Sequence, residues 1–280
     1  MARFLRHYLL ALQFFTRVPV TGRVAAWVGY SPAMLRASAA HFPGVGWLVG
    51  GGAALITALL LAYLPSNPFA PLVAAVLCTC ASVWATGAFH EDGLADVADG
   101  LGGSQDRERA LLIMKDSRVG AFGAIAVVLA LLAKVSLLAL LGAQGIALVC
   151  TALFLAHVVS RTWPLLLIRL LPHVGDAAGS KSKPLADQIS WGSLFTAFSW
   201  CFMALALVGY AQSATDFIAE PVASSALWRP WGAALLASAV AFGLMGRWFK
   251  RRLQGFTGDC LGATQQVCEL AFYLGLSLAL

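Results

Sequence analysis

The feature that most constrains this chain is a series of apolar windows, each long enough to cross a lipid bilayer as a helix. A transmembrane helix needs about 20 predominantly apolar residues. Only 11% of the 280 residues are charged, whereas a soluble domain carries about 25%, so a water-soluble fold would lack the polar side chains to cover its surface. The sequence therefore predicts an all-α, polytopic integral membrane helix bundle. Seven spans are predicted, at 45–64, 69–89, 120–141, 145–165, 191–211, 230–248 and 263–280.

The distribution of Lys and Arg predicts the orientation of this bundle. Seventeen of the 19 basic residues fall in connections that would face one side of the membrane, and only Arg229 falls in a connection on the other side. Because cytoplasmic connections are enriched in Lys and Arg, the N-terminus is predicted to be cytoplasmic and, with seven spans, the C-terminus to lie outside. The net charge of +6 is explained by these basic residues, which set the orientation and lie beside anionic lipid. No nucleic-acid partner is therefore expected. Lys134, inside the third span, is expected to snorkel to a membrane surface.

The first residues predict an interfacial helix that precedes the spans. Arg3, Arg6 and Arg17 fall on one side of such a helix, whereas Leu12 and Phe15 fall largely on the other. A short amphipathic helix with a basic polar face lies in the headgroup region of a membrane.

The remaining patterns predict close packing within a single domain. Gly46 and Gly50 stand four residues apart in the first span, a spacing that favours close helix–helix contact. No strand precedes them and no Lys-Ser/Thr follows, so a nucleotide-binding loop is excluded. No repeat or linker divides the chain, which predicts one membrane domain over residues 1–280.

The stretch His90 to Gly103 gathers carboxylates at the end of the second predicted span. On a helix, Asp92, Asp96 and Asp99 share one narrow face, and Glu91 lies about a quarter turn from Asp92. Such carboxylates repel one another strongly at a membrane edge, and Mg²⁺, which bridges carboxylates to substrate phosphates, would relieve the repulsion. We therefore predict a Mg²⁺ site held by these four residues. A solvated acidic helix face is the alternative, although seven of the 13 acidic residues fall within 91–116.

Other polar residues are predicted to complete this site. Lys115 and Arg118, in "MKDSRVGAFG", suit a phosphate or diphosphate substrate, or else anchor the membrane edge. Asp259, in "LQGFTGDCLGATQQ", is a candidate metal ligand or base, or else a turn residue. Arg161, in "HVVSR", is a functional candidate because charges inside a membrane are costly, or else it snorkels to the cytoplasmic edge.

Several motifs together resemble one enzyme family. Between about residues 10 and 275, the chain is similar to the cobalamin synthase family in "FFTRVPV", "HFPGVGWLVG", "FHEDGLADVADGLGG", "IMKDSRVGAFG", "SRTWPLLL" and "GFTGDCLGATQQ". The resemblance implies a Mg²⁺-dependent transferase of the cell inner membrane that acts late in cobalamin (vitamin B12) biosynthesis. Its small-molecule substrates would be adenosylcobinamide-GDP and α-ribazole or α-ribazole 5′-phosphate, and its products adenosylcobalamin or its phosphate and GMP.

This reaction assigns roles to the predicted site residues. An alcohol attacks one phosphorus of a diphosphate, so catalysis consists chiefly of positioning and charge neutralisation. Lys115 and Arg118 would neutralise phosphate oxygens, with Asp116 orienting one of them. Glu91 or Asp259 would accept the proton of the ribazole hydroxyl. The sequence leaves the oligomeric state open, a homo-oligomer included.

Two other functions compete with this interpretation. Enzymes that transfer a phosphoalcohol from a CDP-alcohol also place spaced aspartates at a membrane edge, but "EDGLADVADG" lacks the Ala-Arg of their motif and has closer spacing. A transporter with a carboxylate cation site would carry acidic residues near midspan, whereas these carboxylates lie at the end of a span and in a connection.

Overall fold

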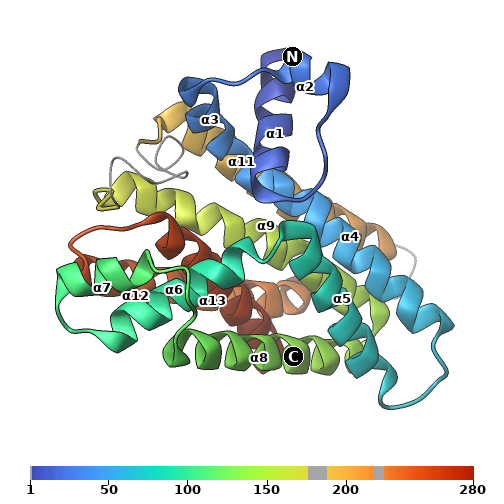
Figure 1. The fold of residues 1–280 in the computed structure, drawn as a ribbon. Helices are drawn as coiled ribbons and strands as arrows, with labels where there is room; N and C mark the ends of the chain where they lie inside the picture. The colour runs from blue at the N-terminus through green and yellow to red at the C-terminus, as the bar shows by residue number, and fades with distance from the viewer. Residues whose placement is uncertain (1, 176–187, 217–223) are drawn as a thin grey trace.

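The computed structural model describes residues 2–175, 188–216 and 224–280, and helices dominate this part of the chain (Figure 1). Its one extended pairing is an isolated bridge between His173 and Phe256. The prediction of an all-α bundle is confirmed. The helices are α1 (Ala2–Phe15), α2 (Gly22–Val28), α3 (Pro32–Ser38), a 3₁₀ turn (Ala39–His41), α4 (Phe42–Tyr63), α5 (Ala70–Thr86), α6 (Phe89–Gly103), α7 (Arg107–Met114), α8 (Ala121–Gln144), α9 (Ile146–Leu170), α11 (Trp191–Asp216), α12 (Ser224–Arg252) and α13 (Gly258–Leu278).

Within the described residues, five helical segments are long and apolar enough to cross a membrane. They are the continuous stretch Pro32–Tyr63, α8, α9 and the apolar parts of α11 and α12. A sixth crossing is added if α5 and α6, which are bent by 88° at their junction, form one span. The predicted seventh span, 263–280, falls on α13, which does not pass this test because it carries many polar residues. The side on which the C-terminus lies therefore stays a prediction.

The predicted N-terminal helix is present as α1, which packs with α2 and α3 at one end of the bundle (Figure 1). Its second half turns Leu12 and Phe15 into the core, while Phe4 and Leu5 are about half exposed, at 48% each. One side of the second half of α1 thus packs against the bundle, while the side chains of its first turn are accessible. This arrangement agrees with the predicted interfacial position.

α13 lies at the centre of the bundle, where it contacts α6, α8, α9 and α12. Small residues permit this approach on two sides. A Cβ atom at Gly275 would lie 2.7 Å from the carbonyl oxygen of Ala233 on α12, and one at Gly262 would lie 3.3 Å from the Cα of His90 on α6. Such distances leave no room for larger side chains, so helix backbones pack directly against α13.

The α4–α9 contact depends on the glycine pair singled out in the sequence. A Cβ atom at Gly46 would lie 2.5 Å from the carbonyl oxygen of His157, and one at Gly50 would lie 3.0 Å from that of Phe154. The predicted helix-packing role of these glycines is confirmed.

The chain turns sharply between α5 and α6. Gly87 and Ala88 both have left-handed backbone conformations, with φ of 69° and 58°. A left-handed residue ends a helix, and two in succession send α6 away at 88° to α5. α6 therefore runs in a direction different from that of α5.

An ion pair lies inside the bundle. Lys134 of α8 is 3% exposed, and its ammonium group is 2.7 Å from Oε1 of Glu269 on α13. Glu269 also accepts hydrogen bonds from the Tyr273 hydroxyl (3.1 Å) and from Nε2 of Gln265 (2.7 Å). The prediction that Lys134 snorkels is wrong, because a charge that has a carboxylate partner in the interior gains nothing by reaching the membrane surface.

We expect Gly46→Val to destabilise the folded protein by about 1–3 kcal/mol, because the new side chain would overlap the backbone of α9. The measurement is the thermal unfolding temperature of the purified protein in detergent. Gly51→Val is the matched control, since a Cβ atom there meets nothing within 4 Å and the change in helix propensity is the same. Equal unfolding temperatures for the two variants would contradict the packing role.

Lys134→Met should destabilise the protein by about 3–5 kcal/mol, because it leaves the buried Glu269 carboxylate without its cation. Adding Glu269→Gln to this variant should restore part of the loss, since the uncompensated charge is then removed. Unfolding temperatures of the two single variants and the double variant test this coupling. Additive effects would show that the ion pair does not act as a unit.

Candidate active site

Three of the predicted carboxylates follow the bend on α6. The stretch is helical, as predicted, and Asp92 is exposed, Asp96 half-buried and Asp99 buried. The pKa of Asp96 is raised to about 7, first by burial and then by the negative charges of Asp259, Asp92 and Asp99. Asp96 therefore lies in the combined field of the other three carboxylates, and a cation there would stabilise its ionised form.

Asp259 reaches this group from the start of α13. Thr257 caps that helix by accepting a hydrogen bond from the Cys260 amide (3.4 Å), and its hydroxyl donates to Oδ2 of Asp259 (3.2 Å). A Cβ atom at Gly93 would lie 2.8 Å from the carbonyl oxygen of Asp259, so this glycine lets α6 and α13 touch. Burial and the charge of Asp92 raise the pKa of Asp259 to about 6.

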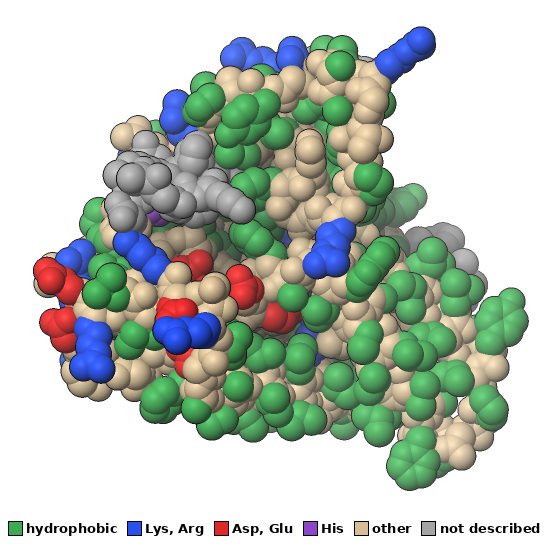
Figure 2. Space-filling view, viewed as in Figure 1, with side chains coloured by type: hydrophobic (Ala, Val, Ile, Leu, Met, Phe, Trp, Pro, Cys, Tyr) green, Lys and Arg blue, Asp and Glu red, His purple; other side chains and the backbone are tan. Residues whose placement is uncertain are grey.

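We call Asp92, Asp96, Asp99 and Asp259 the acidic cluster. Figure 2 shows acidic side chains gathered over α6, α7 and the start of α13, with Lys and Arg among them, on a face that is otherwise largely hydrophobic. The sequence predicted the first three as one face of a helix and Asp259 as a candidate partner. The structure brings all four together.

Asp99 also has a structural role that the sequence did not predict. Its two carboxylate oxygens accept hydrogen bonds from the amides of Gly120 (2.7 Å) and Gly123 (2.8 Å) at the start of α8. A side chain at either glycine would overlap this carboxylate, which explains both glycines of "KDSRVGAFG". Each carboxylate oxygen retains further lone pairs, so the predicted metal role of Asp99 stays a prediction.

The chemistry of the acidic cluster suits a hard divalent cation. Among the described residues, no three His, Cys, Asp or Glu side chains form a ready-made metal cage. Mg²⁺ does not require one, because it is commonly bound by one or two carboxylates, with substrate phosphates and water as the other ligands. Asp92 and Asp96, the more accessible members on α6, are the residues best placed to supply those carboxylates.

Glu91 and Arg161 lie with the interior ion pair instead. Glu91 is buried, and its Oε1 accepts a hydrogen bond from Nε2 of Gln266 on α13 (2.9 Å). Arg161 is 1% exposed and donates to the carbonyl oxygen of His157 (3.0 Å). The snorkelling alternative for Arg161 is therefore wrong. The structure does not bring Arg161 to the acidic cluster, and the predicted roles of both residues in binding metal or phosphate stay predictions.

The predicted phosphate-binding residues Lys115 and Arg118 are exposed beside the acidic cluster. Arg118 lies two residues before Gly120, whose amide binds Asp99. Its guanidinium donates to both oxygens of Asp116, with distances from 2.6 to 3.1 Å. These hydrogen bonds lower the pKa of Asp116 to about 2, so Asp116 stays ionised and orients Arg118, as predicted.

Sequence reasoning missed Glu269 and the partnership that it makes with Lys134. A signal was present, since Glu269 is a single carboxylate within the predicted span 263–280 and Lys134 a single cation within 120–141. Isolated opposite charges in two apolar spans are a reason to expect that those helices touch.

Comparisons with known proteins identify chains similar to this one. Residues 7–277 match the family described as Cobalamin-5-phosphate synthase. A protein of Albidiferax ferrireducens is 71% identical over the whole of both chains, and one of Polaromonas naphthalenivorans is 63% identical over the whole of both. One of Leptothrix cholodnii is 48% identical over 96% of this chain and 94% of its own. All three are named adenosylcobinamide-GDP ribazoletransferase.

No solved structure matches the chain. The family match covers "FHEDGLADVADGLGG", "IMKDSRVGAFG" and "GFTGDCLGATQQ", which supply the acidic cluster and the Arg118–Asp116 pair. It favours the cobalamin synthase prediction over the CDP-alcohol transferase and the transporter. The chain belongs to the cobalamin-5-phosphate synthase family.

Proposed function

We propose that this chain joins adenosylcobinamide-GDP to α-ribazole or α-ribazole 5′-phosphate and releases GMP, with Mg²⁺ as its cofactor. The observation that carries the proposal is the acidic cluster, formed where α6 meets the starts of α8 and α13. The relatives' shared name supports the substrates, and the clustered oxygen donors support the metal.

The proposed chemistry is a displacement at phosphorus. The ribazole hydroxyl oxygen forms a bond to the phosphorus that carries the cobinamide, and the bond from that phosphorus to GMP breaks. Mg²⁺, when bound by Asp92 and Asp96, would neutralise charge on the diphosphate and on the departing GMP. Asp259 is the better placed of the two predicted bases, because it lies in the cluster and its pKa of about 6 suits proton transfer near neutral pH. Arg118, oriented by Asp116, would contact phosphate oxygens.

We further propose that the acidic cluster faces the cytoplasm from the cell inner membrane. Two connections rich in Lys and Arg meet beside it: Arg107 donates to the carbonyl oxygen of Leu253 (2.7 Å), and Arg252 to that of Ser104 (2.6 Å). Both connections therefore lie at the same end of the bundle, as the predicted orientation requires.

Asp96→Asn should lower the rate of GMP release by about a hundredfold or more, because the cluster loses a charged metal ligand at its centre. The measurement is GMP formed from adenosylcobinamide-GDP and α-ribazole by purified protein. Glu108→Gln is the matched control, since Glu108 is an exposed carboxylate on the neighbouring helix α7. A variant Asp96→Asn with near-wild-type turnover would exclude the metal role of Asp96.

Mg²⁺ activation should weaken as the pH falls below about 7. Protons compete with the metal for Asp96, whose pKa without metal is about 7, so the apparent affinity should drop about tenfold per pH unit below that value and level off above it. Titrations of activity with Mg²⁺ after treatment with EDTA, at pH 6, 7 and 8, measure this. An affinity that does not change with pH, or full activity in EDTA, would argue against metal binding at Asp96.

A further inference from the structure

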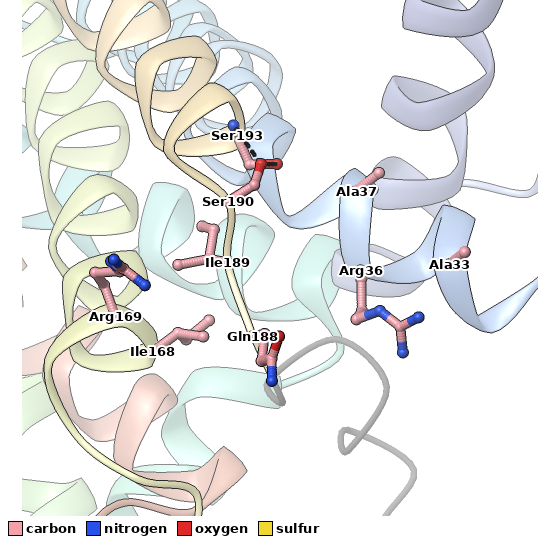
Figure 3. A pocket seen from close by; sticks show the side chains of 9 residues that line it. All are labelled: Ala33, Arg36, Ala37, Ile168, Arg169, Gln188, Ile189, Ser190 and Ser193. Atoms are coloured by element: carbon pink, nitrogen blue, oxygen red, sulfur yellow. Dashed lines mark hydrogen bonds between the residues drawn. The ribbon is translucent and has the colours of Figure 1, made fainter.

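A polar cavity outside the acidic cluster has no part in the chemistry described above. It has a volume of ≈ 470 Å³, is open on one side, and lies between α3, the end of α9 and the segment that leads into α11 (Figure 3). Figure 3 shows Arg36 and Arg169 on opposite sides of it, with Gln188 between them. No Asp or Glu belongs to the part of its lining that the structure describes.

Arg36 is half-buried and Arg169 is exposed at the mouth of the cavity, and both differ from other arginines of the bundle. Arg107, Arg161 and Arg252 each donate hydrogen bonds to carbonyl oxygens of neighbouring helices or connections. Among the described residues, Arg36 and Arg169 have no hydrogen-bond or carboxylate partner; Arg169 stacks on Trp191, 4.6 Å from the ring centroid. A stacked guanidinium keeps its in-plane N–H groups available, and these match two oxygens of a phosphate.

The cavity is close to the reaction site. Ile168 lines it and also lines a narrow aromatic cleft that includes Gly258 and Leu261 of α13. Gly258 directly precedes Asp259 of the acidic cluster. The cavity therefore shares a wall residue with a cleft that reaches the start of α13, next to the acidic cluster.

On the basis of the proposed function, we infer that this cavity binds the 5′-phosphate of the incoming ribazole nucleotide. Two guanidinium groups face one cavity, and no carboxylate belongs to the described part of its lining, so they create a positive potential there that favours a phosphate monoester. The diphosphate of the other substrate must lie at the acidic cluster, where it reacts, so the 5′-phosphate is the remaining anion. Gln188 and Ser193 add hydrogen-bonding groups at the same wall.

The test compares two acceptors that differ only in this phosphate. With α-ribazole 5′-phosphate, Arg36→Gln and Arg169→Gln should each raise KM about tenfold or more, because each removes a charge-assisted contact. With α-ribazole, both variants should keep KM and kcat within about twofold of wild type, since no phosphate is present to lose its contact. Arg36→Lys should show an intermediate KM for the phosphorylated acceptor, because the charge remains and the paired N–H groups do not.

Arg23→Gln is the matched control. Arg23 is exposed on α2, outside the cavity, and its replacement changes the net charge by the same amount. An equal rise in KM for both acceptors, or no rise for either, would overturn the inference, as would the same selective effect from Arg23→Gln.

Calorimetric titration of wild type and Arg169→Gln with α-ribazole 5′-phosphate alone separates this inference from the proposed function. Weaker binding by the variant supports the phosphate site even if no GMP is released, whereas equal binding overturns it. Absence of GMP with either acceptor in the wild type would count against the proposed reaction only.

Discussion

The structure depends on balancing the charges in its apolar interior with opposite charges and hydrogen-bonding groups of neighbouring helices. Four charged side chains meet among α6, α8, α9 and α13: Lys134 and Arg161 balance Glu91 and Glu269. Lipid offers no water to solvate such groups, so they are tolerated only where neighbouring helices supply partners. α13 contributes Glu269, Gln265 and Gln266 to this network, and for that reason it lies at the centre of the bundle and not at its surface.

The same helix contacts bring the interior network and the acidic cluster into register. Glu91 and Asp92 are neighbours on α6, and the Gln266–Glu91 hydrogen bond holds one side of that helix against α13. Gly93 then lets the start of α13 approach, which places Asp259 beside Asp92. The bend at Gly87 and Ala88 gives α6 its direction. Asp99 finally fixes the start of α8 through the two glycine amides. The orientation of α6 about its own axis thus positions both the interior network and the acidic cluster.

Local patterns in the sequence predicted local features well. Helical periodicity placed three aspartates on one face of α6, and four-residue spacing identified the glycines that pack against α9. What the sequence could not reveal were contacts between distant segments. Lys134 alone resembled a snorkelling residue because its partner Glu269 lies on another helix, and α13 resembled a span because apolar residues outnumber its polar ones. The sequence also showed no sign that Asp99 accepts hydrogen bonds from backbone amides. Its partners, Gly120 and Gly123, are separated from it by a connection and by helix α7.

The position of the acidic cluster at the end of the bundle follows from the same electrostatics. Groups that bind a metal ion or a phosphate must keep charge available for the ligand, and an uncompensated charge in the apolar interior costs several kcal/mol. Inside the bundle, Lys134 and Arg161 therefore interact with other groups of the protein and not with a ligand. At the end of the bundle, Asp92 and Arg169 are exposed and Asp96 and Arg36 half-buried. Water can therefore solvate their charges, as the proposed binding of a cation and an anion requires. The acidic cluster and the arginine-lined cavity carry opposite charge, as expected if, as proposed, one substrate is held by its phosphate in the cavity while its hydroxyl reacts at the cluster.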